Sequence, residues 1–374
     1  MNSVKKTRMS LYLLVLSIVI IIGIAFFNHP MFGKAPSGKR LERIQKNKHY
    51  KKNSFQNISP TPALAEGVSY WEIFKDMILT KVEHTRPNDS IPYINTNLAK
   101  LDIQEDYFIW FGHSSYFIQA DLKSYLIDPV LTKNASPIYG TNVAFKGADV
   151  FDVNDLPKID FLIITHDHYD HLDYTTFKTL QHKVSKVVCP LGVGEHLEYW
   201  GYPAKNIIEL EWWEEAQLNT TTKIVSTPTR HFSGRGFTRN NTLWTSYVFQ
   251  SEKLNLYFGG DSGYDFHFKE IGEKYGPFDL AIIENGQYNY KWKYIHLLPE
   301  EVIKAVQDLK SSGFIPVHSS KFKLANHPWK EPLEQVAALS HEVKDLRLLT
   351  PKIGEIVYLN RNDQSFEFWW EEIK

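Results

Sequence analysis

Three histidines and three aspartates fall within nine residues of this sequence, in the segment THDHYDHLD at positions 165–173. Imidazole nitrogens and carboxylate oxygens are common protein ligands of zinc and related transition metals. In an extended backbone the side chains of His166 and His168 point to the same side, so both can bind one cation. Asp170 and His171 lie further along the chain and would face a second position. The spacing favours a metal-binding loop over a surface loop that is merely rich in polar residues.

A catalytic metal site needs more ligands than this loop supplies, because zinc takes four or five donors and one position is kept for water. Three further candidates follow apolar runs elsewhere: His231 after KIVSTPTR, Asp261 after LYFGG and His318 after FIPV. Each of them alone would more often be a turn or surface residue. The metal-binding loop itself follows the apolar run IDFLII. Since rigid scaffolds present functional side chains in loops at strand ends, we expect these residues to meet in one site.

Short β runs dominate the chain from about residue 105 onward. They are YFIWF, SYFIQA, SYLIDP and IDFLIIT, followed by KIVSTPT, LWTSYVFQ, LNLYFGGD, LAIIE and FIPVH. The clearest helix between them is predicted over residues 299–312, with Pro299 at its start and Gly313 just past its end. Its buried stripe would consist of Val302, Ala305, Val306 and Leu309. Strand runs in two groups, each followed by helices, predict an α/β protein with two packed sheets and helices outside.

The N-terminal region predicts a membrane anchor. Residues 9–27 contain no charge, and 19 residues are close to the ~20 that a helix needs to cross a bilayer. No small-residue cleavage site follows, which favours an uncleaved anchor over a signal peptide. Basic residues on both sides leave the orientation in the membrane open. The predicted organisation is a basic tail at 1–8, the anchor at 9–27, a basic linker at 28–60 and a catalytic domain at 61–374.

The basic residues of the linker could rest on anionic lipid headgroups or could simply be solvated. A helix is expected within SYWEIFKDMILTKVE, where Trp71, Phe74, Ile78 and Val82 recur on one face.

Composition narrows the function classes. The formal net charge is −1 and the pI is about 7.0, so no global charge points to nucleic acid. The catalytic region also lacks a basic stripe with interleaved aromatic residues. The single cysteine, Cys189, excludes an intrachain disulfide.

The segment THDHYDH resembles the H-x-H-x-D-H signature of the metallo-β-lactamase fold. Further blocks resemble the N-acyl-phosphatidylethanolamine-hydrolysing phospholipase D group, over roughly residues 60–370. These blocks are FGHSSYFI, LIDPVLTKNASP, HDHYDHLDY, IIELEWWEE, TPTRHFSGRG, FGGDSGY, IGEKYGPFDLA, IHLLPEE and FKLANHPWKEP. The stretch ENGQYNYKWKY at 284–294 is more similar to the bacterial branch of this group than to its animal members. The resemblance implies an αββα metallo-β-lactamase sandwich, here behind an N-terminal transmembrane helix.

The resemblance also implies two metal ions and their ligands. The ligands of the first metal would be His166, His168 and His231. The ligands of the second would be Asp170, His171 and His318, and Asp261 would bridge the two ions. Two zinc ions, or manganese or iron in their place, would lower the pKa of a shared water towards about 7 and so supply a nucleophile at neutral pH.

Four other residues are candidates for roles around the metals. In the resembled group, the position of His296 lies beside the scissile group as a hydrogen-bond donor or acid, and that of Tyr169 contacts substrate. His296 could instead serve only the start of the following helix. Arg235 could clamp a phosphate bidentately, although a lone arginine in a glycine-containing loop is more often structural. Asp167 could hold or relay the proton of the nucleophile, or could brace its loop.

These observations predict a membrane-anchored dinuclear zinc hydrolase of the cell membrane. Its reaction would be cleavage of a phosphodiester bond in an N-acyl-phosphatidylethanolamine-like phospholipid. A lactone or carboxylic-ester hydrolase on the same fold is the alternative, because the same activated water would attack a carbonyl carbon. A membrane-tethered metal-binding protein without activity is disfavoured by the complete ligand set. Oligomeric state and the side of the membrane are left open.

Overall fold

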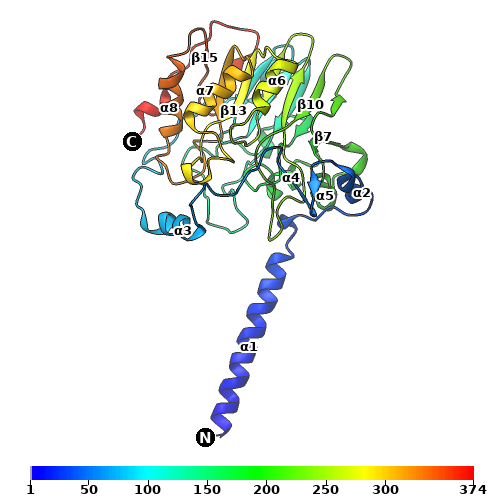
Figure 1. Ribbon diagram of the computed structural model, residues 1–374, viewed down its shortest axis with the longest axis vertical. Coiled ribbons are helices and arrows are strands. Elements are labelled where there is room, and N and C mark those ends of the chain that lie inside the picture. The colour runs from blue at the N-terminus through cyan, green and yellow to red at the C-terminus, as the bar shows by residue number, and fades with distance from the viewer. Residues whose placement is uncertain (1) are drawn as a thin grey trace.

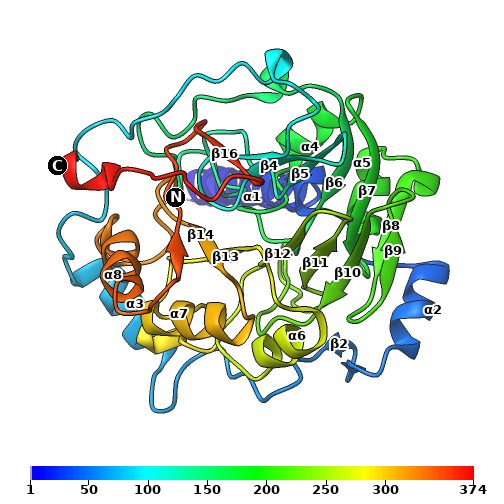
Figure 2. The same ribbon diagram turned by 90° about the horizontal axis from the view of Figure 1, so that it is seen from above.

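In the computed structural model, which describes residues 2–374, two seven-stranded sheets pack face to face and helices cover their outer surfaces (Figures 1 and 2). Met1, the first residue of the predicted basic tail, lies outside the described residues. The two layers of strands, with helices outside each layer, confirm the predicted αββα sandwich. Every β run named from the sequence contains a strand.

The first sheet has the strand order β16-β3-β4-β5-β6-β7-β8. Its strands are β3 (Tyr107–Trp110), β4 (Tyr116–Ala120), β5 (Lys123–Ile127), β6 (Ile159–Ile163), β7 (Val184–Pro190), β8 (Ile207–Leu210) and β16 (Ile356–Tyr358). β16, β3, β4 and β5 pair antiparallel, whereas β5 to β8 pair parallel. Helices α4 (Tyr174–Leu180) and α5 (Gly194–Trp200) connect the parallel strands.

The second sheet repeats this plan, with the order β15-β14-β13-β12-β11-β10-β9. Its strands are β9 (Glu215–Gln217), β10 (Lys223–Thr227), β11 (Ser246–Gln250), β12 (Asn255–Phe258), β13 (Leu280–Glu284), β14 (Gly313–Val317) and β15 (Arg347–Leu348). β9 to β12 pair antiparallel and β12 to β15 pair parallel. Figure 2 shows α6 (His267–Tyr275), α7 (Pro299–Asp308) and α8 (Glu331–Ser340) outside this sheet.

The helix predicted over 299–312 is shorter in the structure and ends at Asp308. All four residues of its predicted stripe are buried, as expected. Lys310 adopts a left-handed conformation with φ of 56°, which ends the helix. The amide of Ser312 then donates to the carbonyl of Phe278, because the chain already enters the parallel sheet there.

Helix α1 (Asn2–Phe27) projects from the domain (Figure 1). Within it, Met9–Phe27 has a mean hydropathy of 2.8, is 0% buried, and is long and apolar enough to cross a membrane. A signal sequence near an N-terminus meets the same criteria.

Residues 28–60 were expected to form a linker, but the structure shows them folded against the domain. They contain α2 (Gly38–Lys46) and a small hairpin of β1 (Tyr50–Lys51) and β2 (Ser54–Phe55). Arg40 forms ion pairs of 2.6 Å with Glu195 and 2.7 Å with Glu209. Ile44 and Phe55 are fully buried in a cluster with Trp212 and Trp244. The two arginines of α2, Arg40 and Arg43, therefore both pair with acidic residues of the domain.

A buried histidine at the start of α6 allows a prediction on acid stability. Burial lowers the pKa of His267 from 6.5 to about 3. Between these two values the unfolded chain binds a proton that the folded chain excludes, so the folded state loses stability as pH falls through this range. At pH 5 the loss is ~2 kcal/mol. We expect His267→Gln to reduce the difference between the thermal unfolding midpoints at pH 7 and pH 5. The exposed control His182→Gln should retain the full difference, and an unchanged difference in His267→Gln would contradict this account.

Candidate metal centre

The chemistry-bearing residues lie at one end of the sandwich because they follow strands that end there. The loop at 165–173 follows β6, Asp261 follows β12 and His318 follows β14, while His231 lies in the loop after β10. Two glycines bring Asp261 close to its neighbours. A Cβ at Gly260 would lie only 2.4 Å from the carbonyl oxygen of Thr245, so a larger residue does not fit. Residues from both sheets thus meet at this end.

The first cluster consists of His166, His168, His231 and Asp261, whose ligand atoms all lie within 4.8 Å of one another. Nδ1 of His168 lies 2.9 Å from Nε2 of His166 and 3.2 Å from Nε2 of His231. Oδ2 of Asp261 lies 3.8 Å from Nε2 of His166 and 3.7 Å from Nε2 of His231. Three imidazoles that aim nitrogen atoms at one point form a site that suits a transition metal.

The second cluster consists of His113, Asp170, His171 and His318. Oδ2 of Asp261 lies 3.3 Å from Nε2 of His171 and 3.2 Å from Nε2 of His318, so this one oxygen also reaches the second cluster. The structure therefore brings together all seven side chains named from the sequence. It also places Asp261 between the two groups, where a bridging carboxylate would stand.

The polar atoms of both clusters fit a pair of cations. Nε2 of His171, Nε2 of His318 and Oδ1 of Asp261 are buried and have no hydrogen-bond partner. An unpartnered buried polar group destabilises a protein by about 1–3 kcal/mol, and a bound metal would satisfy all three atoms. The mixed nitrogen and oxygen donors suit zinc, manganese or iron. The residues present thus match the metals that the sequence implies.

The charges of the clustered side chains also fit a pair of cations. Burial disfavours the charged form of His318, but Asp261 and Asp170 outweigh it and raise the pKa of this imidazole to about 10. Burial would likewise raise the pKa of Asp261, yet His171 and His318 hold it well below the usual value. Protonated imidazoles thus supply positive charge when no metal is bound. Metal binding must displace these protons, since a metal ion binds neutral imidazole.

Two residues that the sequence reasoning missed hold the ligands in place. Asp128 accepts hydrogen bonds from Nδ1 of His171 at 2.8 Å and from the amide of Thr165 at 2.8 Å, which leaves Nε2 of His171 free for a metal. His113, fully buried, lies 2.9 Å from Asp170 through its Nε2. His113, Asp128 and His318 all have positive φ values, a conformation that is uncommon outside glycine and clusters at functional sites. Apart from their place in the resembling blocks FGHSSYFI and LIDPVLTKNASP, the sequence marked His113 and Asp128 only as polar residues at strand ends.

His296 lies beside the clusters and is oriented by a further residue that was missed, Glu284. Nδ1 of His296 lies 2.7 Å from Oε2 of Glu284, so its Nε2 is free. The other oxygen of Glu284 accepts from the amides of Ser262 and Leu297. Burial raises the pKa of Glu284, although His296 lowers it. The ring of His296 stacks on that of His318 with centroids 5.2 Å apart.

Asp167 and Tyr169 do not line the pocket over the two clusters. Asp167 is buried and accepts hydrogen bonds from the amide of Gly234 at 2.7 Å and the hydroxyl of Thr242 at 2.9 Å. It braces the loop after β10 and belongs to neither metal cluster, which favours the loop-bracing alternative. The hydroxyl of Tyr169 donates to the carbonyl of Arg235. Tyr169 lines a cavity beside the end of α1 rather than the pocket that lies over the two clusters.

The side chain of Arg235 donates hydrogen bonds within the protein, which favours the structural alternative over a phosphate clamp. Arg235 is 4% exposed, and Nη1 donates to the carbonyls of Asp167 and Leu172. Nε and Nη2 both donate to the carbonyl of Met31, and the guanidinium packs on the rings of Tyr169 and Trp200. Arg235 therefore ties the segment after α1 to the metal-binding loop.

This role predicts a loss of stability without a loss of substrate affinity. Replacing Arg235 with methionine leaves buried carbonyls unpaired, so we expect the free energy of unfolding to fall by about 3 kcal/mol. The KM of the folded enzyme should stay unchanged. The control Arg239→Met alters an exposed arginine of the same loop and should do neither. Urea unfolding and steady-state kinetics check both points, and a raised KM with unchanged stability would restore the phosphate-clamp role.

A pocket of about 180 Å³, here called the metal pocket, lies over the clusters. Metal-cluster residues and His296 line one part of it, and its remaining lining residues are Phe232, Gln287, Trp292, Ile295 and Leu324. Oε1 of Gln287 accepts from the amides of Leu324 and Ala325 and so fixes that side of the pocket. The site thus combines a polar metal-binding floor with a mainly apolar wall.

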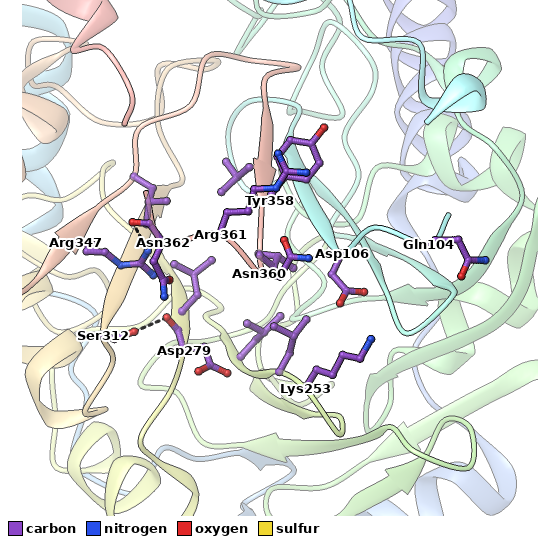
Figure 3. A pocket seen from close by; sticks show the side chains of 16 residues that line it. Gln104, Asp106, Lys253, Asp279, Ser312, Arg347, Tyr358, Asn360, Arg361 and Asn362 are labelled. Carbon is purple, nitrogen blue, oxygen red and sulfur yellow. Dashed lines mark hydrogen bonds between the residues drawn. The ribbon is translucent and has the colours of Figure 1, made fainter. Parts of the chain in front are cut away.

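A second cavity, of about 270 Å³, lies at the opposite end of the same strands (Figure 3). Leu256 and Leu280, near the starts of β12 and β13, line it, whereas Asp261 and Glu284 lie at the other ends of these strands. Within the described residues it shares no lining residue with the metal pocket. It takes no part in the site.

Comparison with known proteins identifies the family. The family described as "Beta-lactamase superfamily domain" matches residues 123–319. An uncharacterized protein of Mycobacterium tuberculosis is 36% identical over 83% of this chain and 84% of its own length. The N-acyl-phosphatidylethanolamine-hydrolyzing phospholipase D 1 of Caenorhabditis elegans is 27% identical over 81% of this chain and 90% of its own length.

A solved structure agrees on the fold. The isothiocyanate hydrolase from Delia radicum gut bacteria superimposes with a TM-score of 0.52 at 19% sequence identity, over 67% of this chain and 98% of that one. Taken with the sandwich and the two His/Asp clusters, these matches show that the chain belongs to the β-lactamase superfamily, as a metal-dependent hydrolase of the metallo-β-lactamase fold related to the N-acyl-phosphatidylethanolamine-hydrolysing phospholipases D.

Proposed function

We propose that this protein is a membrane-anchored phosphodiesterase with two zinc ions, acting on an N-acyl-phosphatidylethanolamine-like phospholipid in the cell membrane. The observation that carries the proposal is the position of Asp261, whose one oxygen faces ring nitrogens of both clusters. A shared carboxylate would hold two cations close together, which is the arrangement used for in-line attack on a phosphodiester. The printed name of the relative from Caenorhabditis elegans supports the substrate class.

In the proposed reaction some side chains would bind the metal ions and another would transfer a proton. When bound, the two metal ions supply Lewis acidity and lower the pKa of water at the site. His166, His168 and His231 would hold one ion, and Asp170, His171 and His318 the other. His296, held at Nδ1 by Glu284, offers Nε2 to the leaving oxygen and would deliver a proton there. The oxygen of the attacking water would bond to phosphorus as the bond between phosphorus and the headgroup oxygen breaks, so the products would be phosphatidic acid and an N-acylated amino alcohol.

The surroundings of the site support an amphiphilic substrate. Phe232, Trp292, Ile295 and Leu324 line the metal pocket and would contact the apolar part of a lipid while excluding bulk water. Helix α1 would hold the pocket near a substrate that resides in the bilayer. Neither the apolar wall nor helix α1 would favour the binding of a soluble, polar substrate.

One experiment separates this function from the alternative lactone or carboxylic-ester hydrolase. The full chain, purified in detergent and loaded with zinc, is incubated in parallel with a phospholipid extract and with a panel of lactones, and the products are identified by mass spectrometry. His168→Gln serves as the control that lacks a metal ligand. Release of phosphatidic acid by the intact protein alone supports the proposal. Consumption of lactones without turnover of phospholipid contradicts it and favours the alternative.

A further inference from the structure

Helix α3 (Tyr70–Leu79) exposes its large apolar side chains to solvent. Trp71 is 61% exposed, Phe74 is 53% exposed and Leu79 is 74% exposed. The rings of Trp71 and Phe74 stack with centroids 5.4 Å apart, and the ammonium of Lys75 lies over Trp71. A surface helix usually turns such a stripe to the core. Exposed apolar patches of this kind mark interaction sites.

This helix is fixed beside the metal pocket. Asp76 forms an ion pair with Lys291, whose carbonyl also accepts from the amide of Ala65 at 2.8 Å. The next residue after Lys291 is Trp292, which lines the metal pocket. The capping box of Ser69 and Glu72 defines where α3 begins. The exposed stripe therefore has a set position relative to the site.

Other exposed apolar side chains lie around the end of α1. Phe237 is 85% exposed, and its ring packs on Phe27, the last residue of α1, with centroids 4.7 Å apart. Tyr139 is 95% exposed and, with Met31, lines a cavity of about 580 Å³ next to α1. Figure 1 shows that α3 lies at the end of the domain from which α1 projects.

We propose that these side chains form one membrane-contacting surface, here called the interfacial face, that rests in the headgroup region of the bilayer. Its residues are Trp71, Phe74, Leu79, Tyr139, Phe237 and Ile138, the last of which is 55% exposed. The inference rests on the membrane anchorage in the proposed function and goes beyond it, because a tether alone would let the domain take any orientation.

A bilayer is the occupant that the chemistry of this face favours. The face is continuous with α1, since Phe237 contacts the last residue of the apolar span. Tryptophan and tyrosine prefer the membrane–water interface, where one edge of the ring is apolar and the other is hydrated. Lys75 and Lys133, both exposed, can reach anionic headgroups while their methylene stems stay in apolar surroundings. The bilayer would then lie against the segments that form the metal pocket, so a lipid could reach it without crossing water.

Cysteine labelling of the full chain tests this surface, because the native Cys189 is fully buried. The variants Phe74→Cys and Tyr139→Cys are labelled with a nitrobenzoxadiazole thiol reagent and reconstituted in vesicles of phosphatidylcholine and phosphatidylglycerol. Phe237→Cys, next to α1, is the positive control. Leu122→Cys is the matched negative control, since Leu122 is also apolar and 56% exposed but lies in the turn between β4 and β5. That turn is at the end of the strands away from the metal clusters.

We expect positions 74 and 139 to give blue-shifted emission and several-fold stronger quenching by headgroup-labelled nitroxide lipids than position 122. An aqueous signal from either position would overturn the proposal. A blue shift without lipid quenching would also overturn it, because a protein partner or a second copy of the chain would then cover the face. The measurement needs no turnover, so it stays decisive even if phospholipid is not the substrate. Conversely, if the protein is an active phosphodiesterase but position 74 is solvated, the proposed function stands and the interfacial face is wrong.

Discussion

Replacing Asp261 with asparagine is expected to lower kcat/KM at least about a thousandfold, because the charge stabilisation given by two metal ions is worth several kcal/mol. Oδ2 of Asp261 faces Nε2 of His166, His171, His231 and His318 at distances between 3.2 and 3.8 Å. An amide at this position keeps the size of the side chain. It removes the negative charge that would lie between the two proposed cations and can turn an N–H donor towards them.

The measurement that checks this prediction is metal content, by elemental analysis, together with the rate. We expect both to fall in Asp261→Asn. Asp173→Asn is the matched control, because Asp173 lies in the same metal-binding loop but caps α4 by accepting from the amide of Thr176 at 2.8 Å. Asparagine is as good an N-cap, so this variant should keep its metal and its rate. An Asp261→Asn enzyme with full metal and full activity would rule out the bridging role.

Replacing His296 with glutamine is expected to reduce kcat by about 10²–10⁴, the usual range for loss of a general acid or base. Nδ1 of His296 is bound to Glu284, and the residue lines the metal pocket, so its free nitrogen is the group available to the leaving oxygen. Glutamine cannot exchange a proton at that position. The KM should change little, since His296 would act mainly in the transition state.

The metal content of the variant decides whether His296 transfers a proton or binds a metal ion. A third group with metal-binding spacing consists of Asp261, Glu284, His296 and His318, so His296 is also a candidate ligand. If it transfers a proton, His296→Gln should retain the metal of the intact protein. If its metal content falls together with its rate, the proton-transfer role is wrong. His182→Gln, an exposed histidine-to-glutamine control, should change neither quantity.

Local patterns in the sequence predicted a large part of this structure. Apolar runs of five to eight residues became strands, and the stripe of Val302, Ala305 and Val306 became the buried side of α7. These patterns are readable because burial of apolar side chains has the period of the local backbone. The ligand types and their positions at strand ends were readable for a similar reason, since parallel strands end on the same side of a sheet.

Other features depended on contacts between residues that are far apart in the chain. His113 is recognisable as part of the site only because it meets Asp170, 57 residues away. Arg235 has the chemistry of a phosphate clamp, but the fold surrounds it with carbonyl groups that take up its donors. The basic residues of 28–60 look like a solvated linker until Glu195 and Glu209 are placed beside Arg40.

Helix α3 was predictable from the sequence as a helix, but the side that its apolar stripe faces was not. The sequence determined that it is a helix with an apolar stripe, because helix periodicity and the capping residues are local. Whether that stripe faces the core or the outside cannot be read from its spacing, which is the same in both cases. Packing of the chain around α3 decided it, and left Trp71 and Phe74 exposed beside the metal pocket. The sequence by itself thus predicted seven candidate metal ligands and the elements that carry them. Only the tertiary structure decided which side chains are free to meet metal, substrate or membrane, because that depends on which partners the fold brings to each polar and apolar group.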